Sequence, residues 1–324
     1  MSLINKIFEI KTETDFNLAA LEVFNFQYEN TPIYRSYVNQ NNNHVDKIKN
    51  YKEIPFLPIQ FFKSKKVLAK NYPAVKTFKS SGTTQKNRSQ HYIHNLDLYT
   101  KSFTKTFEKF YGNISQWTIL ALLPSYLEQG HSSLIYMVNH LIKNSNKNSS
   151  FIELDFNKLK DLSIKLKDKK VLLIGVSYAL LEIAEKADLD LKNWTIMETG
   201  GMKGTRKEIV REELHKKLVS SFNVDFIHSE YGMTELLTQA YSKGGGVFST
   251  PKWMKIMIRD FEDPFSYKKT FATGGVNIID LANIYSCSFI ETQDIGKNIG
   301  CSEFEILGRF DHTEIRGCNL ISFN

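Results

Sequence analysis

The chain has 324 residues, of which 42% are hydrophobic and 24% are charged. This composition is that of an ordinary globular protein, long enough for two domains or for one large α/β unit with a small β attachment. No apolar run approaches the roughly 18 residues that a membrane span needs, and the N-terminus lacks an apolar signal region. We therefore expect a cytoplasmic protein. The net charge of +7 indicates either a solvated surface or an acidic ligand, and no aromatic-basic motif supports nucleic-acid binding.

In chain order, residues 3–50 predict helices, because apolar residues recur there at helical spacing. Two prolines exclude a regular helix over 54–59 and favour an extended segment. From residue 117 onward, apolar strand candidates alternate with helix candidates, which predicts a parallel sheet with crossover helices. The strand candidates are 117–123, 151–154, 171–176, 194–198 and 223–227, and the helix candidates are 131–143, 157–168, 178–187 and 205–221.

After Gly244-Gly245-Gly246 the pattern changes to short β-prone runs, which predicts a β-rich subdomain over one end of the sheet. The runs are 253–258, 270–280, 284–290 and 303–307. We expect residues 1–243 to form a helical N-terminal segment and an α/β core. Residues 244–324 would then complete the same domain as its β-rich subdomain.

One loop of hydroxyl groups surrounds a single glycine, Ser80-Ser81-Gly82-Thr83-Thr84, and is followed by Arg88. Backbone amides around a glycine, with hydroxyls beside them, can wrap a polyphosphate without steric conflict or fixed negative charge. The same composition is also that of a common turn. The loop alone therefore leaves both interpretations open.

A second segment, Tyr231-Gly232-Met233-Thr234-Glu235, follows the apolar run 224–227. Tyr231 offers a flat ring on which adenine can stack, and Gly232 permits close backbone approach. Glu235 is a hard oxygen ligand suited to Mg²⁺, with phosphates supplying the other ligands. The alternative is a simple strand-to-helix connection in which Thr234 caps the helix.

These two segments, together with Glu291-Thr292-Gln293-Asp294 and Gly308-Arg309-Phe310-Asp311, resemble the motifs of the adenylate-forming superfamily along most of the chain. The resemblance implies an α/β fold, that of the N-terminal domain of these enzymes, with ATP and Mg²⁺ as cofactors. It implies that Glu235 holds Mg²⁺, that Asp294 binds the ribose hydroxyls, and that Arg309 contacts the ribose and phosphate. The implied ATP-binding residues are Ser80, Ser81, Gly82, Thr83, Thr84, Gly200, Gly201, Met202, Tyr231, Gly232, Met233, Asp294 and Arg309.

The chain departs from the superfamily at two places. Where the family has Gly-x-Pro-Lys, this sequence reads Gln85-Lys86-Asn87-Arg88, so Arg88 stands in for the lysine with the same charge and a different geometry. The chain also ends at Asn324, thirteen residues past Asp311, where family members continue into a mobile C-terminal domain with a catalytic lysine. We expect no separate mobile C-terminal domain here.

Further segments narrow the resemblance to LuxE-type acyl-protein synthetases. They are Ile54-Pro55-Phe56-Leu57-Pro58-Ile59 with Phe61-Phe62-Lys63, Leu123-Pro124-Ser125-Tyr126, Ser132-Ser133-Leu134-Ile135-Tyr136-Met137, Glu198-Thr199-Gly200-Gly201-Met202-Lys203-Gly204 and Arg316-Gly317-Cys318-Asn319-Leu320. This likeness implies activation of a long-chain fatty acid to acyl-AMP and transfer of the acyl group to a protein thiol. The partner would be an acyl-acceptor protein of the reductase or acyl-carrier type.

The predicted catalytic residues are Cys318, Arg88, Thr234 and Glu235. Cys318 is the proposed thiol nucleophile near the C-terminus, and its alternative is a small packing residue in a turn. Tyr126, His131 and His228 are the candidates for the acyl pocket, although either histidine is as readily a hydrogen-bonded structural residue. The three cysteines have no CxxC spacing, which predicts neither a disulfide framework nor a zinc site.

Two other functions remain open from the sequence. Phenylacetate-CoA ligases share the nucleotide motifs, so the chain can instead be read as an acyl- or aryl-CoA ligase. The departures at Gln85 and Arg88 also fit a degenerate nucleotide-binding partner without catalysis.

Overall fold

The computed structural model describes residues 2–41, 45–81, 88–124, 130–186, 189–200, 209–263, 266–300 and 302–310. In these ranges the helices are α1 (Leu3–Phe8), α2 (Glu13–Asn30), α3 (Pro32–Gln40), α4 (Phe61–Ser64), α5 (Leu96–Tyr111), α6 (Ser133–Lys143), α7 (Phe156–Lys165), α8 (Ser177–Ala184) and α9 (Arg211–Phe222). The strands are β1 (Leu57–Pro58), β2 (Lys76–Lys79), β3 (Gln90–Ile93), β4 (Thr118–Leu122), β5 (Ser150–Phe151), β6 (Val171–Val176), β7 (Thr195–Thr199), β8 (Ile227–Tyr231), β9 (Ala240–Ser242), β10 (Val247–Ser249), β11 (Met254–Arg259), β12 (Thr273–Asp280), β13 (Phe289–Gly300) and β14 (Glu303–Arg309). A short 3₁₀ turn, η6 (Leu281–Asn283), follows β12.

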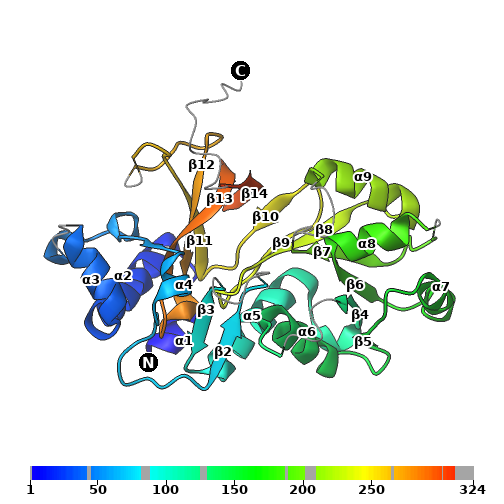
Figure 1. The fold of residues 1–324 in the computed structure, drawn as a ribbon, viewed down its shortest axis with the longest axis horizontal. Helices are drawn as coiled ribbons and strands as arrows, with labels where there is room; N and C mark the ends of the chain where they lie inside the picture. Colours follow the sequence, from blue (N-terminus) through cyan, green and yellow to red (C-terminus); the bar gives the residue numbers. More distant parts are fainter. Residues whose placement is uncertain are drawn as a thin grey trace.

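Within the described residues, twelve strands form one sheet in the order β11-β12-β13-β14-β10-β9-β8-β7-β6-β4-β5, with β1 paired to β13. β5, β4, β6, β7 and β8 run parallel, and helices α6 to α9 lie in their connections. α8 and α9 cover one face of these strands, and α5 and α6 cover the other (Figure 1). β4 and β6 are buried along their whole length, as parallel strands covered on both faces require. The predicted parallel sheet with crossover helices is confirmed.

Apart from β1, the remaining strands of the sheet pair antiparallel, beginning with β8 and β9 and continuing through β10, β14, β13, β12 and β11. This part contains the β-rich region that the sequence predicts after residue 244. The three glycines 244–246 form the turn between β9 and β10 with positive φ values of 148°, 64° and 72°, conformations that glycine adopts most easily. The domain boundary at 243/244 stays a prediction.

The predicted helices of the N-terminal region are confirmed as α1, α2 and α3. Thr12 and Asp15 form a capping box at the start of α2, and Pro32 begins α3, where its missing N–H costs no hydrogen bond. The ring of Phe289 on β13 packs against Phe24 of α2 and Tyr34 of α3, with centroids 6.3 and 6.1 Å away. Figure 1 shows α2 and α3 beside the antiparallel part of the sheet, to which these ring contacts attach them.

The predicted extended segment at 54–59 contains β1, which pairs in parallel with β13. Two predicted strands are misplaced. The strand expected at 223–227 is β8 at 227–231, because α9 continues to Phe222 and ends on Asn223 in the left-handed conformation at φ 49°. The run 284–290 is mostly turn, and β13 begins only at Phe289.

No helix among the described residues combines the length and the apolar character that crossing a membrane requires.

Candidate active site

The predicted nucleotide segment 231–235 begins inside the sheet, because Tyr231 is the last residue of strand β8. Residues 227–231 pair with β7 in parallel and with β9 antiparallel. Because side chains alternate along a strand, His228 and Glu230 point to one face, whereas Tyr231 points to the other. Because Tyr231 ends this strand, the predicted nucleotide motif begins at the carboxyl end of β8, where ligands bind in open α/β sheets.

The structure brings Tyr231, Asp294 and Arg309 together, as the sequence motifs predict. The hydroxyl of Tyr231 donates to Asp294 Oδ2 at 2.7 Å, and Arg309 Nε lies 3.6 Å from Asp294 Oδ1. Asp294 and Arg309 face each other across the β13–β14 ladder. The phenol and the guanidinium therefore orient one carboxylate from two sides.

The ring of Tyr231 is only 9% exposed. It packs edge-on against Phe248 of β10 and Phe304 of β14, each 5.8 Å away between centroids. Burial and the neighbouring charge of Asp294 raise the pKa of Tyr231 well above its usual value, so the hydroxyl keeps its proton and remains a donor. Stacking of adenine on this ring stays a prediction.

Residues 232–238 form a turn between β8 and β9, and hydrogen bonds hold its backbone. Thr234 O lies 2.8 Å from His91 Nδ1, and Glu235 O accepts from Asn283 Nδ2 at 2.8 Å. The side chain of Glu235 is 5% exposed. A predicted Mg²⁺ ligand thus lies on a fixed backbone, which favours preorganised binding.

The far end of this turn is held by Asp280, the last residue of β12. Asp280 Oδ2 accepts from the backbone N–H of Leu237 at 2.7 Å and of Thr238 at 3.0 Å. Asp280 Oδ1 accepts from the Thr238 hydroxyl at 2.6 Å and from Ala282 N at 3.2 Å. Burial raises the pKa of Asp280, although these hydrogen bonds oppose the shift.

Gly232 has a steric reason to be glycine. A Cβ at this position would lie 2.4 Å from Glu230 Oε1, closer than unbonded atoms approach. The carboxylate of Glu230 thus occupies the space beside the Gly232 backbone. A side chain at 232 would displace this buried carboxylate.

The predicted phosphate loop is described at its two ends. Ser80 N donates to Ser89 O at 3.1 Å, and Ser89 N donates to Ser80 Oγ at 3.0 Å. These bonds close the base of the loop between β2 and β3. Ser80, Ser81 and Arg88 are partly buried, while Gly82, Thr83 and Thr84 lie outside the described residues.

The other predicted site residues are partly placed. Gly200 follows β7 with a φ of 69°, and its carbonyl accepts from Ser177 Oγ at 2.8 Å. His131 is exposed, and its carbonyl accepts from Lys79 N at 2.9 Å. Met233 and Thr234 are partly buried in the turn after β8. Gly201, Met202, Tyr126 and Cys318 lie outside the described residues.

His228 faces α5, where Tyr111 Oη lies 3.2 Å from its Nδ1. Burial, and to a smaller extent the charge of Lys243, lower the pKa of His228 to about 4. The ring is therefore neutral at neutral pH. Its role in an acyl pocket stays a prediction.

Two buried glutamates on neighbouring strands have opposite electrostatic environments. Burial tends to raise the pKa of Glu198, but the side chain of His215, whose Nε2 lies 3.7 Å from Glu198 Oε1, and the charge of Arg211 outweigh it, so the net pKa is lowered. For Glu230, burial raises the pKa to about 7; the Thr199 hydroxyl that donates to it opposes the shift, and the charge of Glu198 adds to it. Glu230 therefore holds a proton over a pH range in which an exposed glutamate is ionised.

Replacing Glu230 by Gln is expected to flatten the pH dependence of stability between about pH 4.5 and 7. In this window folded Glu230 keeps a proton that the unfolded chain releases, so the free energy of unfolding of the wild-type protein falls as the pH rises. The full difference is about 3 kcal/mol. Urea unfolding at pH 5 and pH 8 measures it, with the exposed Glu303→Gln as control. Parallel pH profiles for Glu230→Gln and the wild-type protein would contradict the assignment.

His91, Asn283 and Asp280 are the site residues that sequence reasoning misses. Their contacts to the turn span 143, 48 and 43 residues of sequence, so no local sequence motif predicts these contacts. The burial of β3 alternates, with His91 and Ile93 buried, but its sequence Gln-His-Tyr-Ile lacks the apolar/polar alternation that would mark His91 as inward-facing.

Among the described residues, no group of three or more His, Cys, Asp or Glu side chains is arranged to hold a metal ion. A divalent ion at Glu235 would then take further ligands from phosphate oxygens and water, as Mg²⁺ commonly does. Binding of Mg²⁺ by Glu235 stays a prediction.

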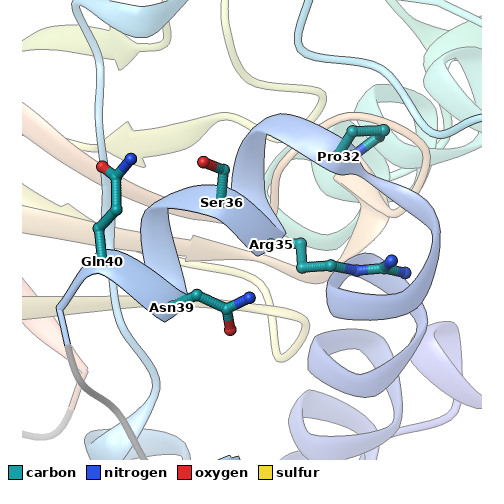
Figure 2. A pocket seen from close by; sticks show the side chains of 5 residues that line it. All are labelled: Pro32, Arg35, Ser36, Asn39 and Gln40. Carbon is teal, nitrogen blue, oxygen red and sulfur yellow. The ribbon is translucent and has the colours of Figure 1, made fainter.

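Two cavities on the surface of the described residues lie away from this site. One of about 440 Å³ is lined by Pro32, Arg35, Ser36, Asn39 and Gln40. Figure 2 shows that these side chains all come from the single helix α3, and Figure 1 places this helix at the opposite side of the molecule from α8 and α9. The guanidinium of Arg35 in this cavity already donates hydrogen bonds to the carbonyls of Tyr28 and Glu29.

Comparison with solved structures identifies the class of fold. An open conformation of 2-hydroxyisobutyryl-CoA ligase in complex with 2-HIB-AMP and CoA matches with a TM-score of 0.65 at 12% identity, over 92% of this chain and 71% of that chain. ATP-bound MatB from Rhodopseudomonas palustris matches with a TM-score of 0.55 at 15% identity, over 73% of this chain and 48% of that chain. The chain thus spans about half the length of MatB. No protein-family model and no curated protein sequence matches it.

At these identities the likeness is one of fold. It confirms the predicted fold class, the N-terminal-domain fold of adenylate-forming enzymes, with its parallel strands, crossover helices and strand-rich C-terminal part.

Proposed function

We propose that the protein uses ATP to convert a long-chain fatty acid to acyl-AMP and then transfers the acyl group to a protein thiol. The observation that carries the proposal is the contact of Tyr231, Asp294 and Arg309 beside the fixed turn of Glu235. Three sequence-distant motifs that resemble one nucleotide site meet at the end of one strand. Solved ligases of the same fold contain ATP or an acyl-AMP, which supports the nucleotide assignment.

In this proposal the residues act mainly by positioning and by stabilising charge. Asp294, oriented by Tyr231 and Arg309, accepts the ribose hydroxyls. The Ser80–Ser89 loop and Arg88 hold the phosphates while the fatty-acid carboxylate attacks the α-phosphate and pyrophosphate leaves. Mg²⁺ held by Glu235 would neutralise charge on the phosphate oxygens.

We further propose that the thiolate of Cys318 attacks the acyl-AMP carbonyl and releases AMP, which leaves a thioester whose acyl group a reductase or acyl-carrier protein then receives. The described cysteine, Cys287, is a poor alternative. It is fully buried, and burial raises the pKa of its thiol to about 12. A thiolate is the nucleophilic form, so Cys287 is unreactive near neutral pH.

A carboxylate-dependent exchange of labelled pyrophosphate into ATP tests the first step, with a panel of fatty acids of different chain length. The wild-type protein is expected to catalyse this exchange with at least one of them. No exchange with any fatty acid would contradict acyl activation and would favour a nucleotide-binding partner without catalysis.

The Cys318→Ser variant tests the second step. It is expected to retain exchange but to lose the hydroxylamine-labile acyl group that intact-protein mass spectrometry detects on the wild-type chain. Cys287→Ser, at a buried thiol, is the matched control and should still be acylated. Equal labelling of the Cys318→Ser and wild-type proteins would overturn the role of Cys318.

A CoA ligase is the second candidate, because the 2-hydroxyisobutyryl-CoA ligase of the same fold was solved with CoA. Incubation with ATP, Mg²⁺, fatty acid and CoA separates the two functions. Formation of acyl-CoA at the rate of the exchange would favour the ligase, whereas acylated protein without acyl-CoA favours the proposed synthetase.

A further inference from the structure

His91 is a fully buried histidine in β3, two residues after Ser89 closes the predicted phosphate loop. Its ring packs edge-on against Phe62 of α4, with centroids 5.7 Å apart. β3 pairs with β2, and these two strands form a sheet separate from the large one. His91 thus projects from the hairpin that carries the loop into the interior of the protein.

Each ring nitrogen of His91 lies close to an oxygen atom, one of the turn after β8 and one of Asn283, which holds that turn. Nδ1 is 2.8 Å from Thr234 O, and Nε2 is 2.9 Å from Asn283 Oδ1. The amide of Asn283 has a determined orientation, because its Nδ2 donates to Glu235 O and Cys287 O, both at 2.8 Å. Its Oδ1 therefore faces His91 as an acceptor.

The protonation state of His91 decides how many of the two neighbouring oxygens its ring can donate to. Burial lowers the pKa of His91 to about 4, although the contacts with Thr234 and Asn283 oppose the shift. At neutral pH the ring has one N–H, so it donates to one of the two oxygens. Either tautomer connects β3 to the turn, directly through Thr234 or indirectly through Asn283 and the Glu235 carbonyl.

We propose that His91 is a positioning residue that holds the Thr234–Glu235 backbone in register with β3 and with Ser89, the described end of the predicted phosphate loop. The inference rests on the proposed function, in which the loop and Glu235 bind the same polyphosphate. Thr234 and Asn283 lie 143 and 192 residues from His91 in sequence, so the contact connects two elements that otherwise belong to different sheets. Loss of this contact would loosen the fit between the two elements and reduce the entropic advantage of a preformed site.

The variant His91→Phe removes both nitrogens and keeps an aromatic ring for packing against Phe62. It is expected to raise the KM for MgATP in the exchange reaction, or to lower its kcat, by about tenfold, the effect of one lost hydrogen bond. His94→Phe is the matched control. His94 lies just after the same strand, accepts no contact from the turn, and has its Nδ1 2.8 Å from Pro73 O.

Two further variants test the direct contact with Thr234 and the indirect contact through Asn283 separately. In His91→Asn the side-chain amide takes the place of Nδ1 and can donate to Thr234 O, whereas in His91→Gln it takes the place of Nε2 and can reach Asn283. At least one of them is expected to recover most of the exchange activity. Because both keep a donor, they also keep the test valid if His91→Phe fails to fold.

The outcomes distinguish this inference from the proposed function. If the wild-type protein catalyses exchange and the folded His91→Phe variant has the same KM and kcat, the positioning role is wrong. It is also wrong if His91→Phe lowers only the melting temperature, because a merely structural residue would do that. If the wild-type protein itself shows no exchange, it is the proposed function that fails, and the inference fails with it.

Discussion

Glu235→Gln is expected to lower the rate of carboxylate-dependent pyrophosphate exchange by roughly 10²- to 10³-fold, as removal of one charge-stabilising group typically does. The amide is isosteric with the carboxylate but is a much weaker ligand for Mg²⁺. The backbone of residue 235 is held by Asn283 through its carbonyl, so the substitution leaves the turn in place. The loss should therefore appear in kcat and in the Mg²⁺ dependence, with the melting temperature little changed.

Glu303→Gln is the control for this experiment, since it makes the same chemical change at an exposed position of β14. Its exchange rate should equal that of the wild-type protein. A Glu235→Gln protein with an unchanged Mg²⁺ dependence would remove Glu235 from the proposed metal site.

Asp280→Ala is expected to have the largest effect on stability, about 3–5 kcal/mol. The substitution leaves three buried backbone N–H groups, those of Leu237, Thr238 and Ala282, without their acceptor. It also removes the acceptor of the Thr238 hydroxyl. Because two of these groups belong to the turn after Glu235, exchange activity should fall even at temperatures at which the protein stays folded.

Urea unfolding measures the change, and Asp161→Ala provides the comparison. Asp161 is exposed on α7, where such a substitution changes stability by at most about 0.5 kcal/mol. A loss of less than about 1 kcal/mol for Asp280→Ala would mean that water or a rearranged neighbour satisfies the freed groups.

The parallel part of the fold could be predicted from the sequence because its strands are continuous apolar runs between amphipathic helices. β6 is the clearest case, since its predicted bounds of 171–176 equal the observed ones. β8 was harder. Its residues after Ile227 are polar or aromatic, and hydrophobicity alone places the strand four residues too early, where Asn223 in fact ends α9.

The candidate site was predictable where its residues belong to short motifs. Tyr231, Asp294 and Arg309 meet as the motifs imply. The support of the turn was not predictable, because Asp280 and Asn283 reach it from the end of β12 and from η6. Their roles depend on the register of the antiparallel strands, which a single sequence does not specify.

The continuity of the large sheet has a mechanical consequence. Tyr231 ends β8, and Asp294 and Arg309 lie on β13 and β14, which are joined to β8 through β9 and β10. The spacing between these candidate nucleotide-binding groups is therefore set by backbone hydrogen bonds across neighbouring strands. The β2–β3 hairpin belongs to a separate two-stranded sheet among the described strands (Figure 1). The place of the hairpin beside this part of the sheet is therefore set by side-chain contacts, such as His91 Nδ1 to Thr234 O and the ring of Phe78 against Tyr99, and not by strand pairing.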